Sequence, residues 1–262
     1  TWGFSSETPA AGMLFNTPSC TSRVALSEFL KKRHGSDAAL SAAWGLPVSL
    51  NQVGEGEWNT PLTPAAQADL ADFSSVMVEK FFGELSAACR AVDPHHLNLG
   101  IRYYTIPPHW ALAGMRHFDV FSMNCYRPRL PAEEMAEISA MLRQPILIGE
   151  WHFGALDVGL PASGIGHVPD QASRGKAYRV YLEDAAAKPW CVGVHYFTLY
   201  DQSALGRFDG ENYNIGFLDI CNQPYPLLAE AARISHGRLY EVCTAQVAPY
   251  NQPPEYLPLL FM

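Results

Sequence analysis

Residues 145–153 have the sequence Pro-Ile-Leu-Ile-Gly-Glu-Trp-His-Phe, an apolar run that ends in the carboxylate of Glu150. A short apolar run of this kind predicts a buried strand. Three other stretches have the same character, and helical patterns separate or follow the runs. Near-continuous apolar strands that alternate with helices predict a parallel sheet buried on both faces. The predicted strands are residues 97–103, 118–126, 145–153 and 191–200, and the helices are 131–142, 170–187 and 226–238.

The positions of polar residues distinguish an open parallel sheet from a (β/α) barrel. Arg102, Asn124, Glu150 and His195 each lie at or just beyond the C-terminal end of a predicted strand. An open sheet gathers its functional groups at one switch point, whereas a barrel gathers them from every strand at one rim. The sequence therefore predicts an α/β fold of the (β/α) barrel type.

The 262 residues are expected to form one domain. Thr63 and Pro64 are typical of a helix start, as N-cap and first helical residue, and the apolar pattern then continues to Val92. Two shorter helical patterns precede this long helix, and loops are expected before residue 23 and over 46–62. The predicted organisation is N-terminal loop and helices over 1–92 (with short helices at 23–34 and 36–44), a strand and helix core over 93–246, and a Pro-rich tail over 247–262.

Composition excludes several classes of function. Eighteen basic against 26 acidic residues give a net charge of -8, which argues against nucleic acid as the main partner. No apolar run reaches the roughly 20 residues that a membrane span needs, and no signal peptide is visible. The six cysteines contain no Cys-x-x-Cys, so we read them mainly as buried free thiols in a cytoplasmic protein, with one disulfide left open. We expect no cofactor, and no metal site, since His-Glu-x-x-His is absent.

Glu150 is the strongest candidate for chemistry. A carboxylate at a strand end, followed by Trp151, His152 and Phe153, emerges from the core into an aromatic environment. Partial desolvation raises the pKa of a carboxyl group, while Arg or Tyr donors hold it ionised. Aromatic walls beside a polar group are what a sugar-binding pocket needs. The alternative is an ion-paired acid with a structural role.

These residues resemble a known family. Residues 148–151 (Ile-Gly-Glu-Trp) resemble the seventh-strand nucleophile segment of the retaining glycosidases built on TIM barrels. Residues 1–3 (Thr-Trp-Gly) resemble the segment just after the fourth-strand Asn-Glu pair in the β-galactosidase and β-agarase branches. Residues 25–45 look like the helical segment that follows, and residues 206–217 are similar to the loop after strand eight in agarase-like members.

The resemblance implies roles for individual residues. Glu150 matches the nucleophile, and Tyr126 matches the sixth-strand tyrosine that hydrogen-bonds it, although a core tyrosine is equally compatible with the sequence. The loop that carries Asp209 either sets specificity or is a solvated turn. The residues expected to bind a β-galactoside-type carbohydrate are Arg102, Asn124, Trp151, His152, His195, Asp201, Glu211 and Asn212.

The chain departs from the family in its second carboxyl group. A retaining glycosidase needs two carboxyl groups about 5–5.5 Å apart, and an inverting one about 6.5–9.5 Å. The resemblance places the acid/base glutamate immediately before the segment like residues 1–3, so the sequence corresponds to strands five to eight, about half a TIM barrel. Open edges on a half barrel are unfavourable. We therefore expect a homodimer that completes the barrel, or completion by an N-terminal half.

Two other functions remain open at this stage. One is hydrolysis of simple esters, with a Ser or Tyr nucleophile and His152 or His195 as base, although no Gly-x-Ser-x-Gly motif is present. The other is a non-catalytic module in which aromatic residues such as Trp110, Trp151 and Tyr196 hold sugar without cleaving it.

Overall fold

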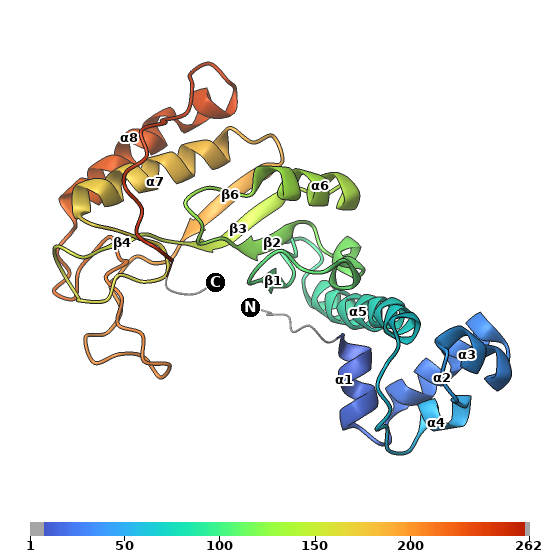
Figure 1. Cartoon of the computed structure of the whole chain (residues 1–262). Helices are drawn as coiled ribbons and strands as arrows, with labels where there is room; N and C mark the ends of the chain where they lie inside the picture. Colours follow the sequence, from blue (N-terminus) through green and yellow to red (C-terminus); the bar gives the residue numbers. More distant parts are fainter. Residues whose placement is uncertain (1–7, 260–262) are drawn as a thin grey trace. The chain divides into compact units, whose positions relative to one another are not determined.

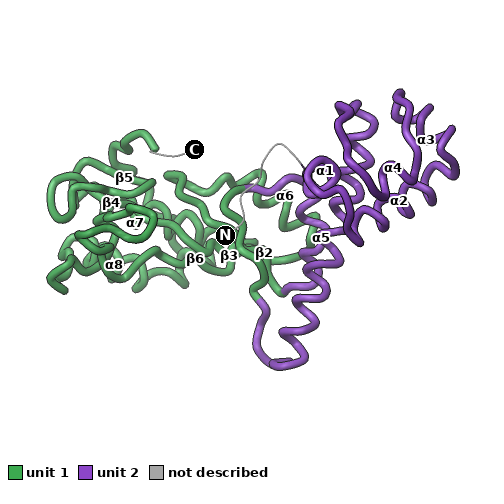
Figure 2. Tube along the Cα trace, turned by 90° about the horizontal axis from the view of Figure 1, so that it is seen from below, with its two compact units in different colours: residues 1–2, 99–105, 119–262 green, residues 3–98, 106–118 purple. Residues whose placement is uncertain are grey.

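A computed structural model describes residues 8–259, which divide into two compact units (Figure 2). One unit is helical and contains residues 8–98 and 106–118. The other contains the sheet and is formed by residues 99–105 and 119–259. The sequence predicted one domain, and this stays a prediction; the helical unit has a hydrophobic core formed by its own buried residues. Residues 1–3, which carry part of the family resemblance, lie outside the described residues.

The helical unit contains five α-helices. The long helix begins and ends as predicted, with the Thr63 hydroxyl accepting a hydrogen bond from the backbone N–H of Ala66. Two helices form where loops were expected, because Thr8 and Ser49 cap them in the same way. Trp44 and Trp58 lie in the core of this unit and are almost fully buried. The helices are α1 (Pro9–Asn16), α2 (Thr21–His34), α3 (Asp37–Trp44), α4 (Leu50–Gly54) and α5 (Pro64–Val92), followed by the short helices η1 (His109–Leu112) and η2 (Met115–His117).

The second unit is built on a four-stranded parallel sheet with strand order β1-β2-β3-β6. This confirms the predicted parallel α/β architecture. Figure 1 shows α6, α7 and α8 on one side of the strands, so helices cover one face of the sheet. The strands are β1 (Arg102–Tyr103), β2 (Phe121–Asn124), β3 (Ile146–Trp151) and β6 (Cys191–Tyr196), and the helices are α6 (Ala132–Leu142), α7 (Gln171–Ala186) and α8 (Pro226–Cys243).

The edges of this sheet are β1 and β6. β1 is only two residues long, shorter than the predicted run over 97–103. β6 is more exposed than β3, and Val192 at its start is 63% exposed. A separate two-stranded parallel sheet, β4 (Gly154–Ala155) with β5 (His167–Val168), forms in the segment that follows β3 and was not predicted.

The cysteines correct the sequence interpretation in one respect. All six are free. However, only Cys125 is buried, whereas Cys89, Cys221 and Cys243 are exposed and the other two are intermediate. The thiols are therefore not mainly core residues. No helix within residues 8–259 combines the length and apolar character required to cross a membrane.

Candidate active site

A β-bulge in β3 sets the direction of Glu150. The consecutive residues Met123 and Asn124 of β2 pair with Ile148 and Glu150, so Gly149 is an extra residue in β3. A bulge of this kind bends a strand and redirects its side chains, and it is common beside active sites. Here it brings Glu150 opposite Asn124, at the C-terminal end of the sheet.

Three side chains from β1, β2 and the residues after β2 donate hydrogen bonds to the Glu150 carboxylate. Arg102 Nη2 lies 2.5 Å from Oε1. Asn124 Nδ2 lies 2.7 Å from Oε2, and the Tyr126 hydroxyl lies 2.5 Å from the same oxygen. Asn124 and Tyr126 are two residues apart, so they project to the same face of β2. Such charge-assisted bonds orient a carboxylate and favour its ionised form.

Arg102 reaches Glu150 by passing directly over Gly149. A Cβ atom at position 149 would lie 2.0 Å from Arg102 Cδ, a distance that no real contact allows. Only glycine at position 149 therefore permits this path. The backbone of Gly149 itself has an ordinary conformation, so the requirement is for space. Arg102 Nη1 also lies 3.4 Å from the Gly149 carbonyl oxygen.

Two buried polar atoms beside Glu150 have no hydrogen-bond partner among the described residues. They are Arg102 Nε, a donor, and Asn124 Oδ1, an acceptor. Asn124 is 2% exposed, and leaving a buried polar atom unpaired costs about 1–3 kcal/mol. A ligand hydroxyl can both donate and accept, so it is suited to satisfy such atoms.

Tyr126 and His152 form the aromatic side of the site. Burial, and then the hydrogen bond to Glu150, raise the pKa of Tyr126 far above its ordinary value, so its hydroxyl stays protonated. The His152 ring lies 4.7 Å from the Tyr126 ring, between centroids. Burial lowers the pKa of His152 to about 3, and its Nε2 accepts a hydrogen bond from the Ile165 N–H. His152 is thus a neutral wall residue that is 2% exposed.

Trp151 requires a correction. It was expected to contact the sugar, but its side chain lies on the opposite face of β3 from Glu150, as alternation along a strand demands. It is 1% exposed and stacks on Tyr181 of α7 at 4.2 Å between centroids. Tyr196 packs edge-on against the same indole. Trp151 and Tyr196 therefore hold the sheet to its helices, so neither forms part of an open sugar-binding surface.

The remaining predicted residues lie in different settings. His195 is exposed on β6, and because Tyr196 faces the helices, His195 projects to the face of Glu150. Asp201 has a structural role, since its two oxygens accept hydrogen bonds from the Tyr225 hydroxyl and the Gly216 N–H, and burial raises its pKa. Two further residues, both half-buried, lie on the loop after β6; they are Glu211 and Asn212.

Glu211 is the loop residue most clearly linked to the site. Its Oε2 accepts a hydrogen bond from Gln202 Nε2 at 2.7 Å and lies 3.5 Å from Arg207 Nη2. Its charge also contributes to the raised pKa of Tyr126. Asp209, on the same loop, is instead engaged by the Arg207 guanidinium.

Sequence reasoning missed Arg174 of α7, which supports the segments that follow β3 and β6 beside the site. It is fully buried, and it donates to the carbonyl oxygens of Phe153 at 2.6 Å and Gly216 at 2.7 Å. It also contacts the Tyr196 hydroxyl at 3.2 Å. It ties together the segments that follow β3 and β6. Nothing in a helix sequence separates such an arginine from a surface one.

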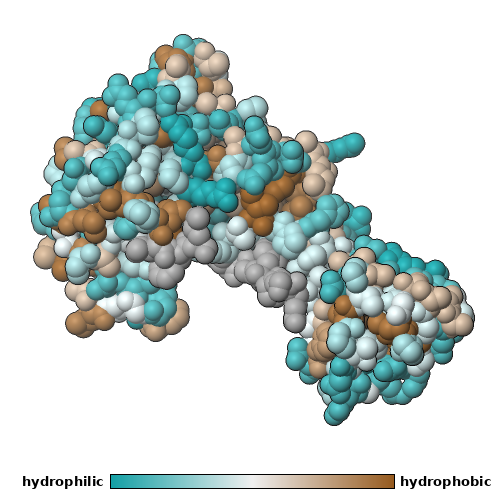
Figure 3. All heavy atoms as spheres, in the orientation of Figure 1, coloured by the Kyte–Doolittle hydropathy of each residue, from teal (hydrophilic) through white to brown (hydrophobic). Residues whose placement is uncertain are grey.

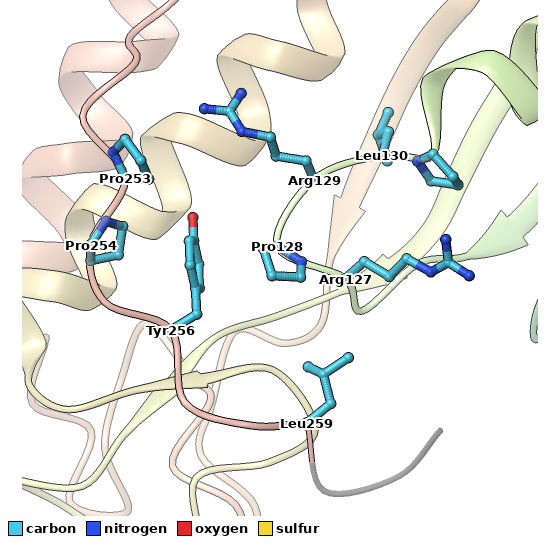
Figure 4. Close-up of a pocket in the computed structure, with 9 residues that line it drawn as sticks. Arg127, Pro128, Arg129, Leu130, Pro253, Pro254, Tyr256 and Leu259 are labelled. Atoms are coloured by element: carbon cyan, nitrogen blue, oxygen red, sulfur yellow. The ribbon is translucent and has the colours of Figure 1, made fainter.

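Other candidate sites are weaker. Within residues 8–259, no group of three or more His, Cys, Asp or Glu side chains is arranged to hold a metal ion. A cavity of about 720 Å³ lies between the loop after β2 and the C-terminal segment (Figure 4). Its lining includes four prolines, two arginines and Tyr256, but none of the donors to Glu150.

The chain has sequence relatives among β-agarases. No protein-family model matches the chain. The chain is 33% identical over 223 residues to β-agarase B of Vibrio sp. (strain JT0107), a match that covers 83% of this chain. The chain spans about a quarter of that relative's length, 23%.

Solved structures give the same result. An exo-β-agarase superposes with a TM-score of 0.82 at 32% identity, over 90% of this chain and 32% of the solved chain. An agarase named AgWH50C superposes with a TM-score of 0.82 at 30% identity, over 88% of this chain and 33% of that chain. The chain therefore has the fold of one part of a glycoside hydrolase, as its sequence predicted.

Proposed function

We propose that this chain provides the nucleophile of a glycoside hydrolase that cleaves β-galactoside-type polysaccharide, with Glu150 as the attacking group. The observation that carries the proposal is the Glu150 carboxylate at the C-terminal end of the sheet, held by Arg102, Asn124 and Tyr126. Homology to β-agarases supports the substrate class.

In the proposed reaction, a Glu150 oxygen attacks the anomeric carbon while the bond to the leaving oxygen breaks. A second carboxylic acid gives its proton to that oxygen, and a water molecule then releases the sugar from Glu150. Tyr126 and Arg102 orient Glu150 through their hydrogen bonds, and the unpaired Arg102 Nε and Asn124 Oδ1 bind a sugar hydroxyl. His152, His195, Glu211 and Asn212 are proposed to line the same site, whereas the structure gives Asp201 and Trp151 other partners.

The second carboxyl group is proposed to come from a second copy of the chain or from another polypeptide. This chain matches about a third of the solved agarases, and its sheet has two edges at which further strands could pair. We propose that a second copy of the chain completes the sheet, as the sequence suggested. Light scattering during size-exclusion chromatography is the test, and a dimer is expected. A monomer at micromolar concentration would exclude the second copy and leave completion of the sheet to another polypeptide.

An aryl glycoside tests Glu150 without depending on the second carboxyl group. p-Nitrophenolate leaves without being protonated, so p-nitrophenyl β-galactoside needs only the nucleophile for its first step. A burst of p-nitrophenolate is expected, followed by slow turnover that azide accelerates, because azide attacks the glycosyl-enzyme without a general base. Glu150→Gln should abolish the burst, whereas Glu133→Gln, on an exposed residue of α6, should not.

A fluorinated galactosyl fluoride provides direct identification. It should label the peptide that contains Glu150, and mass spectrometry would locate the adduct. Labelling of a different acid would refute the assignment. The ester-hydrolysis alternative loses one candidate base, because His152 is buried and neutral with Nε2 already engaged. p-Nitrophenyl butyrate turnover that survives Glu150→Gln and not His195→Ala would restore it.

A further inference from the structure

The loop of residues 203–212 displays two large apolar side chains to solvent. Leu205 and Phe208 are each 99% exposed. Figure 1 shows this segment, in orange, projecting beyond the ends of the strands, and the same projection carries brown, apolar atoms in Figure 3. Complete exposure of one apolar residue is ordinary, but two at one loop tip require a reason.

The loop is held in a defined shape. At its base, the Gln202 N–H donates to the Tyr213 carbonyl oxygen and the Tyr213 N–H donates to Gln202 Oε1. Asn214 is anchored to β4 by two hydrogen bonds with the backbone of Ala155. Near the tip, the Arg207 N–H bonds to the Glu211 carbonyl oxygen, and the Arg207 guanidinium pairs with Asp209. Leu205 and Phe208 are therefore presented by a loop that its own hydrogen bonds hold in shape.

This loop belongs to the Glu150 site. The Tyr213 ring at its base lies 6.3 Å from the His152 ring, which in turn contacts Tyr126. These ring contacts, from Tyr213 through His152 to Tyr126, place the base of the loop beside the aromatic side of the Glu150 site.

We propose that Phe208, supported by Leu205, is a platform on which a sugar ring of the polysaccharide packs, beyond the sugar attacked by Glu150. An aromatic face beside charged and polar groups matches a pyranose, which has an apolar face and an equatorial rim of hydroxyls. The Arg207 guanidinium, 5.8 Å from the Phe208 ring centre, lies where it can meet those hydroxyls. A stable protein interface buries about 1,000 Å² or more, which two side chains at a loop tip do not supply. This proposal rests on the proposed glycosidase function. It adds that the substrate must be a polymer.

Binding to agarose separates this platform from catalysis. In affinity electrophoresis with agarose in the gel, the Glu150→Gln variant should be retarded without degrading the matrix. Adding Phe208→Ala should weaken binding roughly 10-fold, since an aromatic ring loses its apolar contact. Tyr240→Ala is the matched control, because Tyr240 is 85% exposed but lies on α8. It should bind like its parent.

The outcomes are distinguishable. Equal binding with and without Phe208→Ala overturns the platform and leaves the proposed function intact. Absence of agarose binding by the parent, together with no burst on the aryl galactoside, overturns the proposed function and the platform with it. A smaller mass in light scattering for Phe208→Ala identifies the loop as a protein interface and also overturns the proposal. In the active chain, Phe208→Ala should leave aryl galactoside turnover unchanged while the rate on polysaccharide falls about 10-fold.

Discussion

Replacing Gly149 by alanine should detach Arg102 from Glu150. The new methyl carbon would lie 2.0 Å from Arg102 Cδ, 2.9 Å from Cγ and 3.2 Å from Nε. Carbon atoms in contact are about 3.5–4.0 Å apart, so the arginine side chain must move by roughly 1.5 Å or more. Its Nη2 is 2.5 Å from Glu150 Oε1, and a shift of that size breaks the hydrogen bond.

The expected loss follows from the strength of that bond. A hydrogen bond to a charged group contributes about 1.5–3 kcal/mol, and the Arg102 side chain is 37% exposed, which favours the lower value. If the transition state uses this contact, kcat/KM on the aryl galactoside should fall about 10-fold. Crowding of the strand should also lower the free energy of unfolding by about 1–3 kcal/mol.

A double-mutant cycle isolates the cause. Gly149→Ala is measured alone, Arg102→Ala alone and both together, by burst kinetics and urea unfolding. In the Arg102→Ala background the colliding side chain is gone, so Gly149→Ala should have little further effect. Gly193→Ala, where a Cβ would meet only the flexible end of Leu147 at 3.0 Å, is the control. Equal losses from Gly149→Ala in both backgrounds would refute the steric explanation.

Three further predictions concern single residues. Tyr126→Phe removes a hydrogen bond to Glu150 and should lower kcat about 10- to 100-fold with a smaller change in KM, measured on the aryl galactoside. Because the pKa of His152 is about 3 when folded, against 6.5 unfolded, the unfolded chain binds one proton more between these values, and stability falls as pH drops through this window by about 1.4 kcal/mol per unit. Urea unfolding of His152→Gln should lack that slope, whereas His195→Gln should keep it. Arg174→Met leaves the Gly216 carbonyl without its arginine donor and the Phe153 carbonyl with the Tyr196 hydroxyl alone, and should cost about 1–3 kcal/mol of unfolding free energy, against no change for the exposed Arg233→Met.

The sheet could be predicted from sequence because its strands are apolar runs bounded by clear helix signals. Helix α5 was predicted to the residue, since Thr63 and Pro64 mark its start with specific local chemistry. Helix α1 was missed because Pro9 and Gly12 interrupt its apolar pattern and threonines flank it. The N-cap Thr8 nevertheless accepts a hydrogen bond from the Ala11 N–H, which supports the start of the helix. Short pairings such as β4 with β5 depend on contacts between distant residues, which no local pattern carries.

The candidate site was predictable to the extent that it lies on strand ends. Glu150, Arg102, Asn124 and Tyr126 converge because parallel strands end at the same edge. Trp151 was placed wrongly because proximity in sequence was taken for proximity in space, although neighbouring residues of a strand face opposite sides. Arg174 could not be found, since its role depends on carbonyl groups contributed by two distant loops.

Gly149 connects the fold to the site. If Gly149 were paired regularly instead of bulged, it would lie opposite Asn124, and Glu150 would share the face of Ile148. The bulge therefore needs an inserted residue, and the path of Arg102 requires that this residue have no side chain. Both conditions are met only by glycine directly before the glutamate. The pair Gly149-Glu150 is thus a local sequence feature whose physical reason is the approach of an arginine from two strands away. Arg102→Lys should not preserve the site, because lysine offers one nitrogen, whereas the Glu150 carboxylate and the Gly149 carbonyl oxygen engage two nitrogens of Arg102.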